Sequence, residues 1–296
     1  MVSLRVRARL LCVALLLLVP AARGEPVTLT DDRGVSISLA RPAQRIVTLA
    51  PSLAELVFAA GAGDRLIAVS TYTDYPPAAA RLPVIGSHGR VDVERVLALA
   101  PDLVLAWQSG NPARDLARLE RLGIPVFTVE PRRLGDIARA LRAVGVLAGT
   151  RQLAEAAAEA FEREVGRLAV VQGKKPLRVF FEIWHEPLVT VSDAHLIGDL
   201  VAHCGGTNVF GGLALLTPRI ARESLYAADP DAVISSVSNG ARDGARALWR
   251  DLPQLRAVRE DRVYAVDPSL LHRQGPRVLD GFHAICASLD LARGGR

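Results

Sequence analysis

The chain has 296 residues, half of them hydrophobic, with 36 lysines and arginines against 31 acidic residues. This length allows two domains of ordinary size. Four arginines and no acidic residue lie in the first 24 residues, so removing those four from 36 leaves 32 basic residues against 31 acidic ones. A nearly neutral chain gives no reason to expect a nucleic-acid partner, and we predict none.

The first 24 residues have the pattern of a secretory signal peptide. Three early arginines precede an apolar run from Leu10 to Pro20, and Ala22-Arg23-Gly24 offers small residues for cleavage. The run is too short to cross a membrane as a helix. Cys12 follows two leucines rather than the small residues of a lipid-attachment site. We therefore expect residues 1–24 to be a cleaved signal peptide and the mature chain to be a soluble exported protein.

After a short polar lead-in, strands and helices alternate along the first half of the chain. A loop is expected at Pro76-Pro77, because adjacent prolines admit neither a helix nor a central strand. Alternation of this kind predicts parallel βα units. The predicted strands are Arg45–Leu49, Leu66–Ser70, Leu103–Ala106 and Pro125–Val129, and the predicted helices are Leu53–Gly61 with Ser52 as its N-cap, Val91–Leu99, Ala113–Leu122 and Leu134–Leu147.

A long helix is predicted over Thr150–Gly173, where strong helix formers dominate. Thr150 can cap its start, and Gly173 with Pro176 gives a stop signal. About 22 helical residues span roughly 33 Å, the width of a small domain. The helix is either packed on one face in the ordinary way or a rigid strut between two lobes. Its predicted apolar stripe consists of Leu153, Ala157, Ala160, Phe161, Val165 and Leu168.

The alternation resumes after this helix, and one internal similarity is visible. Residues 94–105 and 223–234 each give a glutamate on a helix, a Pro-Asp pair seven residues later, and then a strand. The repeat indicates two related lobes, one on either side of the long helix. The predicted strands of the second half are Arg178–Ile183, Ala232–Ser236 and Arg262–Val266, and its predicted helices are Ile197–His203, Arg222–Ala227 and Gly275–Leu291.

Cys204 and Cys286 are the cysteines that remain once the signal peptide is removed. In an oxidising compartment, a lone pair of distant cysteines is most simply a disulfide. It would close a loop of roughly 80 residues and stabilise the fold by about 3–5 kcal/mol in the chain-entropy model. The alternative is a pair of buried free thiols.

Four stretches of the chain resemble the periplasmic cobalamin-binding proteins. They are RIVTLAPSLAELVFAAG (45–61), STYTDYPP (70–77), VERVLALAPDLVLAW (93–107) and CGGTNVF (204–210). These proteins belong to the helical-backbone substrate-binding family, which also carries ferric siderophores and haem. The resemblance covers about residues 45–290.

The resemblance implies an α/β fold of two βα lobes with parallel-type sheets, joined by one long rigid helix. The lobe boundaries are then expected at 25–149 and 174–296, with the connecting helix at 150–173. It also implies a monomer in the periplasm that passes a corrinoid ligand to an ABC importer, made of permease and ATPase subunits at the inner membrane. No cofactor is implied.

The resemblance places the ligand in the cleft between the lobes, where aromatic side chains pack on the corrin. Tyr72 and Trp107 match such aromatic positions. Ile183 stands where the family has an aromatic residue, but Trp184 and His185 follow it and could fill that wall.

Further departures from the family put the ligand's identity in question, but not the fold. His88 and Thr217 each stand where a tryptophan is expected, and Leu270-Leu271-His272 replaces an acidic and aromatic run. We therefore expect that His88, His185 or His272 touches the ligand, conceivably at its metal. A loop histidine that is only solvated or structural is the alternative for each.

Glu94 and Glu223 match the family's two docking glutamates, one in each lobe, which meet arginines on the transporter. Charge pairs of this kind steer and register a partner more than they add affinity. The alternative is that both are ordinary solvated helix residues.

Other functions are less well supported by the sequence. It has no GxSxG, P-loop, GxGxxG after a strand or HExxH motif, and His185-Glu186 lacks the second histidine of a zincin helix. We therefore predict that the chain is not an enzyme. A free-metal-binding protein would need three or four converging ligands, and only His88 and His185 lie at convincing strand ends.

Within the family, the possible ligands are a corrinoid on one side and haem or a ferric siderophore on the other. An anionic siderophore would call for several arginines in the cleft. Arg90, Arg219 and Arg273 could serve, whereas Tyr72 and Trp107 favour the corrinoid.

Overall fold

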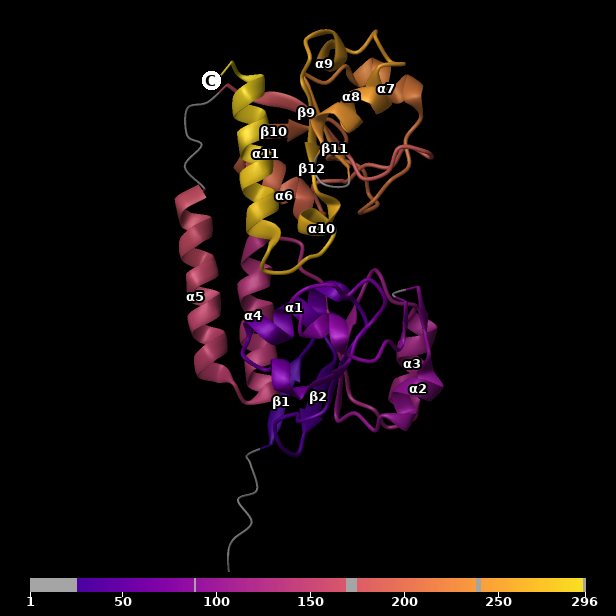
Figure 1. Cartoon of the computed structure of the whole chain (residues 1–296), viewed down its shortest axis with the longest axis vertical. Coiled ribbons are helices and arrows are strands. Elements are labelled where there is room, and N and C mark those ends of the chain that lie inside the picture. The colour runs from indigo at the N-terminus through magenta and orange to yellow at the C-terminus, as the bar shows by residue number, and fades with distance from the viewer. Residues whose placement is uncertain (1–25, 88, 169–174, 238–240, 295–296) are drawn as a thin grey trace, which may run out of the picture.

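The computed structural model describes residues 26–87, 89–168, 175–237 and 241–294. The predicted signal peptide, residues 1–24, lies outside these ranges. Figure 1 shows two lobes, with the N-terminal lobe below in indigo to magenta and the C-terminal lobe above in orange to yellow. The predicted division into two α/β lobes is thus confirmed.

The N-terminal lobe is built on a parallel sheet of four strands in the order β4-β3-β7-β8. Helices α1 and α4 pack on one face of this sheet, and α2 and α3 pack on the other. Two short antiparallel hairpins, β1–β2 and β5–β6, complete the lobe. The bounds are β1 Val27–Thr30, β2 Ser36–Leu39, β3 Ile46–Thr48, α1 Pro51–Ala59, β4 Leu66–Ala68, β5 Gly86–Ser87, β6 Arg90–Val91, α2 Val93–Ala98, β7 Leu103–Trp107, α3 Ala113–Arg121, β8 Val126–Val129 and α4 Leu134–Ala148.

The C-terminal lobe repeats this plan with a parallel sheet in the order β10-β9-β11-β12. In both lobes, the first strand along the chain lies between the second and the third. Helices α6 and α11 pack on one face, and α7, α8 and α9 pack on the other. The bounds are β9 Leu177–Glu182, α6 Leu196–His203, β10 Gly206–Asn208, α7 Arg222–Ala228, β11 Ala232–Ser236, α8 Arg242–Trp249, α9 Arg256–Arg259, β12 Val263–Val266, α10 Pro268–Leu271 and α11 Val278–Ala292.

The repeated Pro-Asp pair performs the same task in each lobe. The Asp102 carboxylate accepts a hydrogen bond from the backbone N–H of Arg45 at 2.9 Å, just before the first strand. The Asp231 carboxylate accepts one from the backbone N–H of Arg178, also at 2.9 Å, at the start of β9. Each aspartate precedes the third strand of its sheet and therefore anchors the start of that sheet's first strand. The internal similarity seen in the sequence reflects two lobes of one topology.

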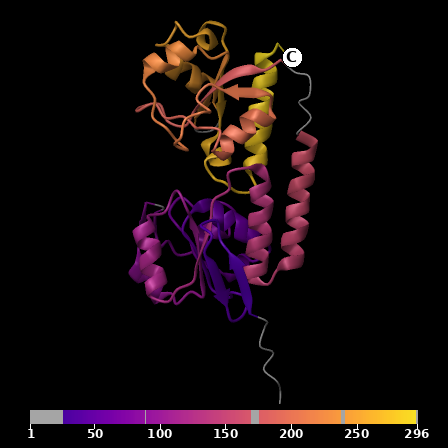
Figure 2. The ribbon, with the colours of Figure 1, turned by 180° about the vertical axis from the view of Figure 1, so that it is seen from behind.

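Helix α5 (Arg151–Leu168) runs along the edge of the molecule. In Figures 1 and 2 it lies beside α4 along the N-terminal lobe, and its C-terminal end lies beside α11 of the other lobe. One cluster of buried apolar side chains continues from α1 and α4 through α5 to α6 and α11. The two lobes therefore share part of their core on this side.

The predicted apolar stripe of this helix is wrong at Leu153 and Ala160, which are both exposed. Leu153 is 60% exposed, and the buried side chains are Ala154, Ala158 and Phe161. Gly145 of α4 explains the shift, because a Cβ placed there would come within 2.1 Å of the Ala154 Cβ. The two helices approach closely through small residues, so alanine rather than leucine faces the partner helix. Ala160, the other misplaced member, is also exposed.

The predicted helix caps need two corrections. Ala50, not Ser52, occupies the N-cap of α1, and Pro51 takes the first helical position, where its missing N–H costs nothing. Thr150 does precede α5, but its hydroxyl donates to the Ala60 carbonyl at 2.7 Å. It therefore ties the start of α5 back to the end of α1.

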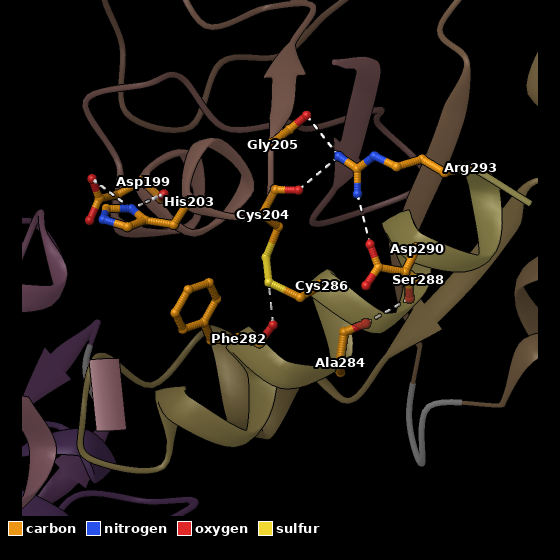
Figure 3. The surroundings of a disulfide bond; sticks show 10 residues. All are labelled: Asp199, His203, Cys204, Gly205, Phe282, Ala284, Cys286, Ser288, Asp290 and Arg293. Carbon is orange, nitrogen blue, oxygen red and sulfur yellow. Dashed lines mark hydrogen bonds and ion pairs between the residues drawn. A yellow bond between two sulfur atoms is a disulfide. The ribbon is translucent and has the colours of Figure 1, made fainter. Parts of the chain in front are cut away.

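Cys204 and Cys286 form a disulfide, as predicted. Figure 3 shows that it joins the end of α6 to α11. Arg293, one residue before the end of the chain's described part, donates to the carbonyl oxygens of Cys204 and Gly205 at 2.9 Å each. The last helix is thus attached to α6 both covalently and by hydrogen bonds.

Candidate functional site

A hollow of about 230 Å³ lies between the lobes. Residues at or just beyond the carboxyl ends of β7 and β9 contribute to it, which is where α/β sheets present their ligands. Both lobes line it: Trp107 and Ser109 come from the N-terminal lobe, and Ile183, His195, Leu216, Thr217 and His272 come from the C-terminal lobe.

Trp107 is held in place by the turn that follows β7. Its backbone N–H donates to the Asn111 side chain at 2.7 Å, and Asn111 in turn donates to the Leu49 carbonyl of the neighbouring strand segment at 3.0 Å. A Cβ on Gly110 would come within 1.8 Å of the indole Cε3. Only glycine fits there, so the turn itself fixes the face of the ring.

Two histidines of the C-terminal lobe line the same hollow. His272 follows α10, and its Nε2 is 2.8 Å from the Ser236 hydroxyl at the end of β11. His195 is the N-cap of α6, and its Nδ1 accepts the Ile197 backbone N–H at 3.1 Å. Burial lowers the pKa of each imidazole to about 4, and for His195 the nearby His272 and Arg132 act in the same direction. Both rings are therefore neutral near neutral pH.

Trp184 and His185 line a second hollow of about 380 Å³, which shares Ile183 with the first. The His185 Nδ1 lies 2.7 Å from the buried carboxylate of Glu182, which also accepts the Trp249 indole N–H at 3.0 Å. Trp184 is 62% exposed. Its indole N–H donates to the Glu186 carbonyl at 2.8 Å, which attaches the ring to its own turn.

Tyr72 lies on a loop that is attached to the other lobe. Its backbone has a φ of 63°, in the left-handed region that favours glycine, and its ring is 78% exposed. The Arg273 guanidinium of the C-terminal lobe donates to the Tyr72 carbonyl at 3.0 Å and to Asp74 at 2.9 Å. Because Arg273 directly follows His272, this loop is tied to one wall of the first hollow.

The structure thus brings some of the predicted residues together and not others. Trp107 and His272 share the first hollow, Trp184 and His185 share the second, and Tyr72 lines neither. His88 lies outside the described residues. The sequence reasoning missed Ser109, His195 and Leu216. Ser109 could have been found as the second residue after Trp107, but no sequence signal marked His195 or Leu216.

None of the three arginines considered for an anionic ligand lines either hollow. Arg273 faces Asp74 and the buried Glu55, and Arg90 lines an outer hollow of the N-terminal lobe. Arg219 is exposed and pairs as a β-bridge with Val189. Among the described residues, neither hollow at the cleft is lined by an arginine or a lysine.

Glu94 and Glu223 occupy equivalent places in the first turns of α2 and α7. Both are exposed. Glu94 lies beside an outer hollow of about 810 Å³, where Arg90, Arg114, Arg118 and Arg121 gather, and it pairs with Arg118 at 2.5 Å. Each glutamate stands on the helix that leads into the third strand of its own sheet.

Within the described ranges, no three His, Cys, Asp or Glu side chains gather where they could hold a metal ion. In the same part of the chain, every helix is too short or too polar to cross a membrane.

Comparison with known proteins gives consistent matches. Residues 46–270 match a family model described as periplasmic binding protein. The vitamin B12-binding protein of Pectobacterium carotovorum is 37% identical over 249 residues, which are 83% of this chain and 88% of that protein.

Solved structures show the same likeness. The periplasmic vitamin B12 binding protein BtuF of Vibrio cholerae has a TM-score of 0.78 at 33% identity, with coverage of 85% of this chain and 98% of that one. A periplasmic haem binding protein from Pseudomonas aeruginosa has a TM-score of 0.70 at 30% identity, with coverage of 83% and 92%.

Proposed function

The chain belongs to the periplasmic binding protein family, and we propose that it captures cobalamin or a related corrinoid between its lobes and delivers it to an ABC importer. The relatives named for vitamin B12 support this choice of ligand. The protein binds and releases its ligand without chemical change. It acts as a monomer in the periplasm, with residues 1–24 removed as a signal peptide and residues 150–173 connecting lobes 25–149 and 174–296.

The observation that carries the ligand class is the neutrality of the interlobe hollow. Trp107 offers an aromatic face, both histidines are uncharged, and no described arginine or lysine lines the wall. Haem and ferric siderophores carry carboxylates or other anionic groups, whose burial without a cation is costly. A corrin ring carries uncharged amides around its edge, so it suits this surface better.

A corrinoid is larger than either hollow, so it would extend over both. The shared residue Ile183 lies at their junction, with Trp107 on one side and Trp184 on the other. In this arrangement Trp107 packs on the macrocycle, while Tyr72, Trp184, His185 and His272 contact its edge or axial face.

Docking to the transporter uses Glu94 and Glu223. Their equivalent positions in two lobes of one topology support this assignment, because a transporter with two matching halves can engage both. The partners are the permease subunits, which are joined on the far side of the membrane to ATPase subunits.

The deciding experiment is a titration of the mature protein, followed by visible absorbance and calorimetry. Cyanocobalamin, cobinamide, haemin and one ferric siderophore are compared side by side. One-to-one binding of a corrinoid with sub-micromolar affinity supports the proposal. Binding of haemin or the siderophore with no corrinoid signal would contradict the cobalamin assignment and leave the family unchanged.

The contact residues are tested by single changes to alanine at Trp107, His88, His185 and His272. His283 on the outer side of α11 provides a matched control, because its ring pairs with Glu164 of α5 at 3.4 Å and is half exposed. Unchanged affinity and spectrum in all three variants of His88, His185 and His272 would mean that none of these histidines touches the ligand.

A further inference from the structure

His195 is a rigidly placed side chain on the wall of the interlobe hollow. It is 8% exposed and lies in that lining together with Trp107 of the opposite lobe. Its backbone N–H donates to Ser192 at 3.1 Å, and its carbonyl accepts the Gly198 N–H at 2.9 Å. Backbone bonds on both sides therefore fix the position from which the ring extends.

The hydrogen bond to Ile197 assigns the proton on the ring. A backbone N–H can only donate, so Nδ1 must present its lone pair to Ile197 at 3.1 Å. A neutral imidazole then carries its hydrogen on Nε2, at the opposite edge of the ring. The low pKa of about 4, caused by burial, keeps the ring in this neutral form.

This leaves an N–H donor in the hollow that the protein does not use. Among the described residues, the ring's hydrogen-bond partner is Ile197, and that bond occupies Nδ1 alone. The His195 residue is 8% exposed, so a ligand in the hollow would exclude water from this donor, and a donor left unpaired without water costs stability. His272, the other imidazole in the lining, differs because its Nε2 already has the Ser236 hydroxyl as a partner.

We propose that His195 is a specificity-determining residue whose Nε2–H donates a hydrogen bond to an uncharged carbonyl oxygen on the bound ligand. This deepens the proposed function and rests on it: for a corrinoid, the acceptor is a side-chain amide at the edge of the ring. A carboxylate could also accept the bond, but no described arginine or lysine in the lining would balance its charge. The site therefore prefers the amide to the acid.

The test compares two substitutions with opposite effects on the donor. His195→Ser keeps a side-chain oxygen that can cap α6 but removes the donor. His195→Gln loses the cap but restores an N–H at a similar distance from the backbone. His203→Asn is the matched control, because His203 lies on the same helix and bonds to the Asp199 carbonyl at 2.8 Å, as Figure 3 shows. Thermal unfolding checks that each variant is folded.

The ligands are cyanocobalamin and its monocarboxylic acids, in each of which one side-chain amide is hydrolysed. We expect His195→Ser to weaken binding of cyanocobalamin by about 5- to 10-fold, the size of one neutral hydrogen bond. His195→Gln and His203→Asn should stay within about 3-fold of the unchanged protein. The unchanged protein should also reject one of the acids, and His195→Ser should reject it less.

Each remaining outcome contradicts either the role of His195 or the proposed function. If a folded His195→Ser variant binds cyanocobalamin as tightly as the unchanged protein, the role of His195 is wrong and the proposed function stands. If His195→Gln is as weak as His195→Ser in folded protein, restoring an N–H donor does not restore binding, and the inference is again wrong. If the unchanged protein binds no corrinoid, the proposed function itself fails.

Discussion

Arg277 and Glu55 join the two lobes through a pair of parallel hydrogen bonds. The Arg277 Nη2 and Nε donate to the two Glu55 carboxylate oxygens at 2.7 and 3.0 Å. Glu55, on α1 of the N-terminal lobe, is only 3% exposed. Arg277 directly precedes α11 of the other lobe, and its guanidinium lies 4.2 Å from the centre of the Tyr75 ring.

Removing Arg277 should destabilise the protein strongly. In Arg277→Ala, the Glu55 carboxylate stays buried with Arg273 at 3.5 Å as its remaining cation. Losing one partner of a buried ion pair typically costs about 3–5 kcal/mol, and we expect the lower end here because Arg273 remains. Urea unfolding measures the loss. Arg167→Ala is the control: it removes an exposed pair with Glu164 and should cost at most about 1 kcal/mol.

Ligand binding should change the angle between the lobes by only a few degrees. The lobes share a buried core along α4, α5 and α11, and Asp199 of α6 holds the Arg133 side chain at 2.9 Å and the Leu134 N–H at 3.0 Å at the start of α4. These contacts would have to break in a wide hinge motion. Small-angle X-ray scattering with and without cyanocobalamin tests this, and a large compaction on binding would contradict it.

Charge reversal at both docking glutamates should abolish transport and leave ligand binding intact. The two sites are not equally available, since Glu94 already pairs with Arg118 whereas no ion pair is recorded for Glu223 among the described residues. A transporter arginine must therefore displace Arg118. We expect Arg118→Ala to strengthen docking by about 2- to 5-fold, the range for one exposed ion pair. Binding to transporter in nanodiscs measures this, with Arg163→Ala on α5 as control.

Acid should destabilise the protein through His195 and His272. Both folded pKa values are about 4, whereas an unfolded histidine titrates near 6.5. The unfolded chain therefore binds protons first as the pH falls, so the stability present above about pH 6.5 is lost progressively towards about pH 4.

Burial is the largest cause of both low pKa values, and the neighbours of the rings modify it. Arg132 and the adjacent imidazole oppose protonation of His195, while Asp267 favours protonation of His272. Urea midpoints at about pH 7 and about pH 5 are compared for the unchanged protein and the His195→Asn/His272→Asn double variant. The double variant should lose less stability over this interval; an equal loss would show that other groups control the acid response.

Local patterns in the sequence were sufficient to predict the layout of the lobes. Buried apolar runs located β7 and β11, and the repeated Pro-Asp pair revealed that the lobes are related. The strand that ends at Trp107 was also predicted from its apolar run, whereas the place of Trp107 in the cleft was implied by the family resemblance. The strands and the repeat depend on neighbours within a few residues, which a sequence records directly.

What the sequence did not reveal depends on contacts between distant segments. Ala154 is buried because Gly145 lets two helices approach, and His195 faces the hollow because the turn before α6 bends it there. Arg273 was considered as a ligand for anions, but it faces Asp74, 199 positions earlier in the chain. No local pattern distinguishes such an arginine from one in a cleft.

The pairing of Glu55 with Arg277 can form only late in the synthesis of the chain. The two residues are 222 positions apart, and the ribosome completes every strand of both sheets before Arg277 emerges. Until Arg273 and Arg277 emerge, the early lobe holds a buried carboxylate without either of its two cations. The last helix also carries Cys286, the partner of Cys204, so the ion pair with Arg277 and the disulfide both need the final segment of the chain.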